Sequence, residues 1–136
     1  MPHIAYVTLL VRDYDEALRF YTESLGFNLI EDTPLGECKR WLLIAPPGAT
    51  ETSILLAKAA TPEQSAHIGD QAGGRAFLFL HTDDFWREYE RMQAKGVVFT
   101  EKPRTEPYGI VAVFIDLYGN RLDLLQLNAG VGITTK

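Results

Sequence analysis

Asp123 places a carboxylate inside a mostly apolar segment, Leu122–Leu127, and a charge in that position needs a physical reason. The segment follows a run of β-branched and aromatic residues, Ile110–Ile115, and residues 117–120 between them read Leu-Tyr-Gly-Asn. Gly and Asn tolerate positive φ, so residues 106–126 are predicted to form a strand, a tight turn and a second strand. The Asp123 carboxylate then faces solvent, pairs with a cation, or binds a metal ion or a substrate. These alternatives separate the possible functions.

The histidines and the cysteine offer weaker chemistry. His3 precedes the first predicted strand, His67 lies in a polar segment and His81 ends a strand, and no two of them have the spacing of a metal-binding pair. Cys38 lies in a charged loop, where nearby cations would lower the pKa of a thiol. Since the sequence identifies no partner for a catalytic triad, we expect Cys38 to be an unreactive loop thiol.

The composition excludes several classes of function. With 136 residues, 46% of them hydrophobic, the chain has the size and core of one globular domain. The net charge of −5 and the scattered Lys and Arg residues argue against nucleic acid or an anionic membrane as the partner. A single cysteine excludes a disulfide within the chain and favours the cytoplasm. There is no signal-peptide pattern and no apolar run near the roughly 20 residues of a membrane span.

Hydrophobic periodicity predicts a strand, a helix and three strands in the first half of the chain. The helix is predicted to begin after Asp13, with Glu16 in the capping-box position, and to end at Gly26. The polar segment Glu31–Lys39 predicts a loop. The predicted strands are Ile4–Val11, Phe27–Ile30, Arg40–Ala45 and Ser53–Ala57.

The second half repeats this order after a polar linker, Thr61–Gly74, with a short helical turn predicted after Pro62. A helix is predicted from Asp83 or Asp84 to Gly96. The remaining predictions are a strand at Arg75–His81, a strand at Val97–Thr100, a loop at Glu101–Pro107, and the hairpin described above. The expected organisation is module 1 at about residues 3–58, a linker at 59–74, module 2 at 75–127 and a loose tail at 128–136.

The two halves align at a constant difference of 70 residues, which indicates an internal duplication. The predicted fold is therefore α+β, with two tandem β-α-β-β-β modules in one domain. The pairs that carry the alignment are Asp13 and Asp83, Gly26 and Gly96, Phe27 and Val97, Trp41 and Val111, Leu43 and Val113, Ile54 and Leu124, and Leu55 and Leu125.

Two segments resemble the vicinal oxygen chelate superfamily, which includes glyoxalase I, extradiol dioxygenases and bleomycin-resistance proteins. VRDYDEALRFYTESLGF at Val11–Phe27 is similar to the family's opening strand and helix. YGIVAVFIDLYGNRLDLLQ at Tyr108–Gln126 is similar to its closing hairpin, with Leu117 where the family often has Pro. The resemblance covers residues 3–127 and implies two curved mixed sheets that form a cup around a ligand. It does not specify a reaction, because the superfamily hosts many chemistries.

The resemblance also implies four positions for a divalent metal. Family enzymes take His, Gln or Glu ligands from the first and last strands of each module. The opening-strand position is Tyr6 and the closing acid is Asp123, and the duplication gives Ala76 and Ser53 as their counterparts. One carboxylate does not make a divalent-metal site where three or more protein ligands are usual. We therefore expect no metal ligands and no cofactor.

Aromatic side chains are predicted to line the cup. Strand alternation places Tyr6 with Thr8 and Leu10 on one face of the first strand. Aromatic rings with a few polar groups suit a planar or apolar ligand, which the tyrosine hydroxyls and Asp123 would orient. Trp41 is the other central aromatic residue and is either a pocket residue or a core residue.

Arg104 either pairs with Asp123 or with an anionic ligand, or is a solvated loop charge. By the duplication His81 matches Val11, which faces the helix and not the cup. No catalytic residue is assigned. The predicted ligand-pocket residues are Tyr6, Trp41, Ser53, Arg104, Tyr108 and Asp123.

The leading hypothesis is a protein that binds a small, partly apolar molecule without metal, as bleomycin-resistance proteins do by sequestration. The alternative is a divergent metal-dependent lyase, isomerase or dioxygenase of glyoxalase type, with an unusual site built from Asp123, Glu37, His81 or a partner chain. A metal-free enzyme with Asp123 as general base and a scaffold with a filled cup are further alternatives. A homodimer is expected, because family members often pair and short exposed strands favour pairing.

Overall fold

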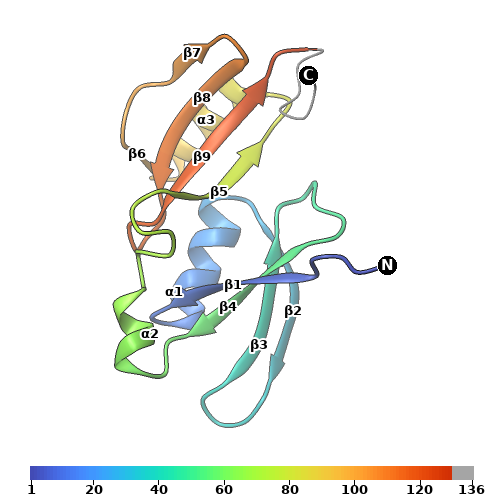
Figure 1. Cartoon of the computed structure of the whole chain (residues 1–136), viewed down its shortest axis with the longest axis vertical. Helices are drawn as coiled ribbons and strands as arrows, with labels where there is room; N and C mark the ends of the chain where they lie inside the picture. The colour runs from blue at the N-terminus through green and yellow to red at the C-terminus, as the bar shows by residue number, and fades with distance from the viewer. Residues whose placement is uncertain (130–136) are drawn as a thin grey trace. The chain divides into compact units, whose positions relative to one another are not determined.

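Each half of the chain folds into a mixed β-sheet with helices beside it (Figure 1). The structure is a computed structural model that describes residues 1–129. Its internal contacts separate unit 1, Met1–Gln71, from unit 2, Ala72–Lys136. The predicted α+β class and the order of elements in both halves are confirmed. Residues 130–136 of the predicted tail lie outside the described residues.

Unit 1 has the sheet order β1-β4-β3-β2, in which β1 runs parallel to β4 and the other neighbours are antiparallel. One face of this sheet carries the core side chains Leu42, Ile44 and Leu56, all of which are fully buried. The elements are β1 (Tyr6–Val11), α1 (Tyr14–Arg19), η1 (Phe20–Ser24), β2 (Asn28–Pro34), β3 (Arg40–Ala45), β4 (Ser53–Lys58) and α2 (Pro62–Ala66).

The first helix begins where the sequence predicts. The Asp13 side chain accepts a hydrogen bond from the backbone N–H of Glu16 at 2.9 Å, which caps α1. After Arg19 the helix continues as the π-helix η1, in which Leu25 N–H donates to the carbonyl of Phe20 at 3.1 Å. The apolar face of this segment, including Ala17 and Tyr21, is buried and packs against β3 and β4.

Unit 2 has the sheet order β5-β9-β8-β6, and β7 also pairs with β8. Its helix is capped by Asp84 and not by Asp83, the residue that the duplication favours. Gln126 accepts a hydrogen bond from Phe85 N–H at 2.7 Å, which ties β9 to the start of this helix. The elements are β5 (Ala76–His81), α3 (Phe85–Ala94), β6 (Val98–Phe99), β7 (Arg104–Glu106), β8 (Gly109–Ile115) and β9 (Arg121–Leu127).

Two predicted loops are partly strands. The loop prediction for Glu31–Lys39 is wrong as far as Pro34, because β2 extends through these residues and pairs with β3. The loop prediction for Glu101–Pro107 is wrong at Arg104–Glu106, which forms β7. All residues of β2 are exposed, so its polar sequence suits a solvated edge strand and hides the strand from a hydrophobicity pattern.

A buried polar pair holds the turn between β8 and β9. Oδ1 of Asp116 accepts hydrogen bonds from Tyr118 N–H and Asn120 N–H, each at 2.9 Å. Oδ2 of Asp116 accepts a third, from the Asn120 side chain, at 2.9 Å. Both side chains are buried, and Gly119 supplies the positive φ of 94° that the turn requires.

The two units share their register in the first hairpin. β2 and β3 pair Asn28 with Ala45, whereas β6 and β8 pair Val98 with Ile115, a difference of 70 at both positions. The internal duplication is therefore reflected in the sheet pairing.

In the closing hairpin the constant shift is wrong. β3 and β4 pair Leu43 with Leu55, whereas β8 and β9 pair Val113 with Asp123. Leu43 and Val113 still differ by 70, so the counterpart of Asp123 is Leu55, 68 residues earlier, and not Ser53. The physical reason is a β8–β9 connection that is two residues shorter than the β3–β4 connection.

A second change affects β5. Its pairing with β9 has a bulge between Ala76 and Leu78, after which Phe79 pairs with Asp123 and His81 with Leu125. The prediction that His81 faces the helix is therefore wrong. The extra residue of the bulge reverses the faces, and His81 is exposed on the side of the sheet that carries Asp123.

Candidate ligand-binding site

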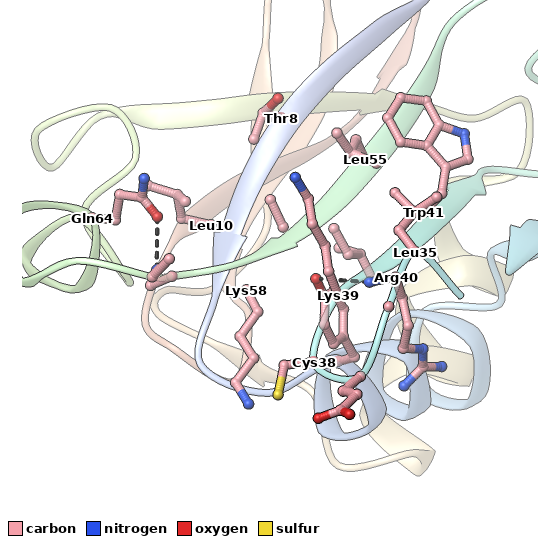
Figure 2. A pocket seen from close by; sticks show the side chains of 17 residues that line it. Thr8, Leu10, Leu35, Cys38, Lys39, Arg40, Trp41, Leu55, Lys58 and Gln64 are labelled. Carbon is pink, nitrogen blue, oxygen red and sulfur yellow. Dashed lines mark hydrogen bonds between the residues drawn. The ribbon is translucent and has the colours of Figure 1, made fainter. Parts of the chain in front are cut away.

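Unit 1 contains a groove of about 820 Å³ along one side of its sheet (Figure 2). Thr8 and Leu10 come from β1, Trp41 from β3, and Leu55 from β4. The segment between β2 and β3 forms a wall of the groove, and Gln64 of α2 lies at its lining as well. A volume of this size is in the range of sites for small organic ligands.

The floor of the groove is apolar because of strand alternation. In β4, Ile54 and Leu56 point to the helix side and are buried, so Leu55 and Ala57 point into the groove. Leu10 is half-buried on the neighbouring strand β1. A ligand with an apolar face can therefore displace water from this floor.

Trp41 is a pocket residue, which decides between the two alternatives that the sequence left open. Its ring meets the ring of Tyr6 edge-to-face, with centroids 5.5 Å apart. Tyr6 is half-exposed and pairs along the sheet with Ser53. Tyr6 therefore supports the Trp41 ring from the side, and Ser53 lies next to Tyr6 on β4.

Arg40 fixes the wall of the groove. Its guanidinium donates to Asp32 at 2.8 and 3.1 Å and to Asp15 at 2.9 Å, and it lies 5.1 Å from the centre of the Tyr14 ring. Hydrogen bonds from Arg40 lower the pKa of Asp32, although partial burial acts in the opposite direction. The same bonds raise the pKa of Arg40. Its neighbours Lys39 and Trp41 are thereby held at the groove.

Asp123 lies in unit 2, on a face of the sheet where its strand neighbours are Phe79 and Val113. Burial raises the pKa of Asp123, and the positive charges of Arg104 and Arg121 oppose this rise. A half-buried carboxylate with a raised pKa can accept and release a proton more readily near neutral pH than an exposed one.

Arg104 pairs with acids of its own hairpin. Its guanidinium is 3.2 Å from a carboxylate oxygen of Glu101 and 3.3 Å from one of Glu106, and its charge acts on Asp123 from a longer distance. Tyr108 lies in the turn between β7 and β8, with 41% of its side chain exposed. The structure therefore brings Tyr6, Trp41 and Ser53 together in unit 1 and Arg104 and Asp123 together in unit 2.

The four positions implied for a metal ion do not supply a ligand set. Within unit 2, neither Phe79 nor Val113 beside Asp123 can bind a divalent ion, and Ala76 pairs with Arg121. Residues 1–129 contain no group of three or more His, Cys, Asp or Glu side chains arranged to hold a metal ion. The donor set therefore does not fit a divalent metal.

The sequence analysis missed the cations of the groove. Lys39 and Lys58 line it together with Arg40, and the sequence analysis considered Lys39 and Arg40 only for their effect on Cys38. The signal was present: Lys39 alternates with the candidate Trp41, and Lys58 directly follows Ala57 on a predicted strand. No helix among the described residues is long and apolar enough to cross a membrane.

Comparisons with known proteins give a consistent result. Residues 3–124 match the sequence model of the Glyoxalase/Bleomycin resistance protein/Dioxygenase superfamily. An uncharacterised protein of Shewanella frigidimarina (strain NCIMB 400) is 58% identical over 126 residues, which cover 92% of this chain and 93% of that protein.

Two solved structures are similar over nearly the whole chain. The crystal structure of UcmS2 has a TM-score of 0.80 and 36% identity, and covers 92% of this chain and 98% of UcmS2. TnmS3, an antibiotic binding protein from Streptomyces sp. CB03234, has a TM-score of 0.75 and 34% identity, and covers 94% of this chain and 98% of TnmS3.

Proposed function

Because the chain belongs to the Glyoxalase/Bleomycin resistance protein/Dioxygenase superfamily, we propose that it binds a small, partly apolar molecule in the unit 1 groove without a metal ion. The observation that carries the proposal is the placement of Trp41 beside the apolar floor formed by Leu10 and Leu55. A rigid indole next to aliphatic side chains suits a planar ring system. The similarity to TnmS3, an antibiotic binding protein, supports binding as the function.

Binding of the neutral fluorescent probe phenylnaphthylamine tests this proposal. We expect Trp41→Ala to weaken binding by about tenfold, since loss of a large aromatic contact removes roughly 1–2 kcal/mol. Trp86→Ala is the matched control, because Trp86 lies on α3 of unit 2 with 51% of its side chain exposed. Binding should be the same with and without a chelator. Absence of binding, dependence on a divalent ion, or equal loss in both variants would contradict the proposal.

The alternative is a divergent lyase, isomerase or dioxygenase, and the raised pKa of Asp123 is the observation in its favour. Asp123→Ala distinguishes the two. If Asp123 is a general base or a metal ligand, this variant loses turnover of any substrate found by screening. If the unit 1 groove is a binding site only, the variant keeps the affinity for phenylnaphthylamine.

The proposal includes assembly as a cytoplasmic homodimer. The strand β2 is exposed along its whole length, and Leu29 and Ile30 present apolar side chains on it. Exposed edge strands of this kind promote pairing between chains. Light scattering should give twice the 15.3 kDa mass of one chain, and a monomer at micromolar concentration would contradict this part. The single cysteine favours the cytoplasm as the location.

A further inference from the structure

The charge on the unit 1 groove has the opposite sign to the charge on the chain. The whole chain has a net charge of −5, whereas the groove lining contains Lys39, Arg40 and Lys58 against one acid, Glu37. We infer that the groove selects an aromatic anion, whose rings lie against the apolar floor and whose carboxylate, sulfonate or phosphate is bound by Lys39 and Lys58. This inference rests on the proposed function and adds the charge of the ligand to it.

The lysines are available to a ligand, whereas the arginine is occupied. Asp15 and Asp32, which pair with the Arg40 guanidinium, both lie outside the lining of the groove. Within residues 1–129, neither Lys39 nor Lys58 forms an ion pair or a side-chain hydrogen bond. Two ammonium groups therefore face the groove without a counter-ion from the protein.

The two lysines reach different parts of the same space. Figure 2 shows the Lys39 side chain extending from the wall segment toward Thr8 and Leu55, so its charge lies over the apolar floor. Lys58 extends from the end of β4 toward the loop that carries Cys38. An anion beside the floor would be bound by an ammonium in a partly desolvated setting, where charge-assisted contacts are stronger than in water.

A neutral ligand of the same shape would leave these ammonium groups without compensation. The difference between a charged and an uncharged ligand therefore measures the contribution of the lysines. Anilinonaphthalene sulfonate and phenylnaphthylamine are a suitable pair of probes, because they share their ring system and differ by one sulfonate.

The first experiment compares the dissociation constants of the two probes by fluorescence at low salt. The native chain should bind the sulfonate at least about fivefold more tightly than the neutral probe, as expected for a charge near two ammonium groups. In Lys39→Met/Lys58→Met this preference should fall to within about twofold, with the affinity for the neutral probe unchanged. Lys102→Met, an exposed residue of unit 2, is the control and should keep the preference.

The outcomes separate this inference from the proposed function. If the native chain binds both probes equally, or the double variant keeps the preference, the inference is wrong and the proposed function stands. If neither probe binds, the proposed function fails as well.

A second experiment reads the potential of the groove directly at Cys38, the single cysteine of the chain, which is exposed and lines the groove. Its thiolate displaces iodide from either iodoacetate, an anion, or iodoacetamide, which is neutral. The ratio of the two rates is independent of the fraction of thiolate, because both reagents attack the same species. In the double lysine variant this ratio should fall by about threefold or more, because the anionic reagent loses its local attraction.

The same thiol reports where the sulfonate probe binds. Saturating anilinonaphthalene sulfonate should slow the reaction of Cys38 with iodoacetamide, since both occupy the groove. An unchanged ratio in the double variant, or no protection by bound probe, would overturn the inference by placing the anion site elsewhere.

Discussion

Replacing Arg40 with Gln should destabilise unit 1 and loosen the wall of the groove. The Arg40 side chain is 24% exposed and bridges Asp32, on the strand before it, and Asp15, on the first helix. Its guanidinium also lies 5.1 Å from the centre of the Tyr14 ring. Glutamine keeps a polar side chain of similar reach but removes the charge and the bidentate geometry.

The magnitude follows from these contacts. The pair with Asp32 is about two-thirds buried, since the Asp32 side chain is 32% exposed, whereas Asp15 is 70% exposed and its pair is strongly screened. Partly exposed pairs contribute about 0.5–1 kcal/mol each, and a cation–π contact about 0.5–1 kcal/mol. We expect Arg40→Gln to lower the free energy of unfolding by about 1.5–2.5 kcal/mol. For a domain of this size that loss lowers the Tm by roughly 5–10 °C.

The loss should depend on pH in a defined direction. Hydrogen bonds from Arg40 hold the pKa of Asp32 below its ordinary value, so the folded state releases the Asp32 proton more readily than the unfolded state does. This stabilisation is fully present above the unfolded pKa, near 4, and disappears as the pH falls through the folded pKa. The difference between the native chain and Arg40→Gln should therefore shrink below about pH 4.

Thermal and urea unfolding followed by circular dichroism at about pH 7 and about pH 3 measures both effects. Arg12→Gln is the matched control, because the Arg12 side chain is 70% exposed and pairs with Glu16 one turn away, an arrangement that contributes roughly 0.3–0.5 kcal/mol. A loss in Arg40→Gln no larger than in Arg12→Gln would refute the reasoning, as would a difference that stays constant down to about pH 3.

Three further predictions concern unit 2. Burial raises the pKa of Asp123, so this carboxylate costs stability once the pH rises above its folded pKa; Asp123→Asn should therefore stabilise the chain near neutral pH and make no difference at strongly acidic pH, and equal effects at both would contradict this. Asn120→Ala should cost about 1–3 kcal/mol in urea unfolding, because the buried Asp116 carboxylate loses its side-chain donor, and a neutral effect would show that water replaces it. Gly109→Ala should destabilise by about 1–3 kcal/mol or more, because a Cβ there would clash with the β9 backbone, while Gly48→Ala, with open space around it, is the control that should fold normally.

The sequence predicts the repeated order of elements because apolar periodicity and helix caps are local signals. Asp13 caps its helix as predicted, and Gly26 and Gly96 both adopt positive φ at 82° and 86°, which ends the helical segments. The strands β2 and β7 escape prediction because their residues are polar and lie at exposed edges, so backbone pairing alone makes them strands.

The candidate site is predicted less completely. Trp41 is identified from its type, and Tyr6 from strand alternation. Lys39 and Lys58 are not identified, because a lysine on an edge loop or at the end of a strand is usually a solvated charge. Their shared position at one groove follows from the sheet order β1-β4-β3-β2, which brings the ends of β4 and the β2–β3 segment together and which local sequence patterns do not specify.

The π-helix η1 bears on how the two halves of the chain diverged. From Asp13 to Gly26 unit 1 uses thirteen steps along the chain, whereas unit 2 uses twelve from Asp84 to Gly96. A π turn is an α-helix that has accepted one inserted residue, which explains the extra step. The bulge in β5 is a one-residue insertion in the other unit, so the two length changes cancel by the glycine. An ungapped alignment of the halves thus hides two compensating insertions, and removal of one residue from Phe20–Ser24 is the change that this fold is best prepared to accept.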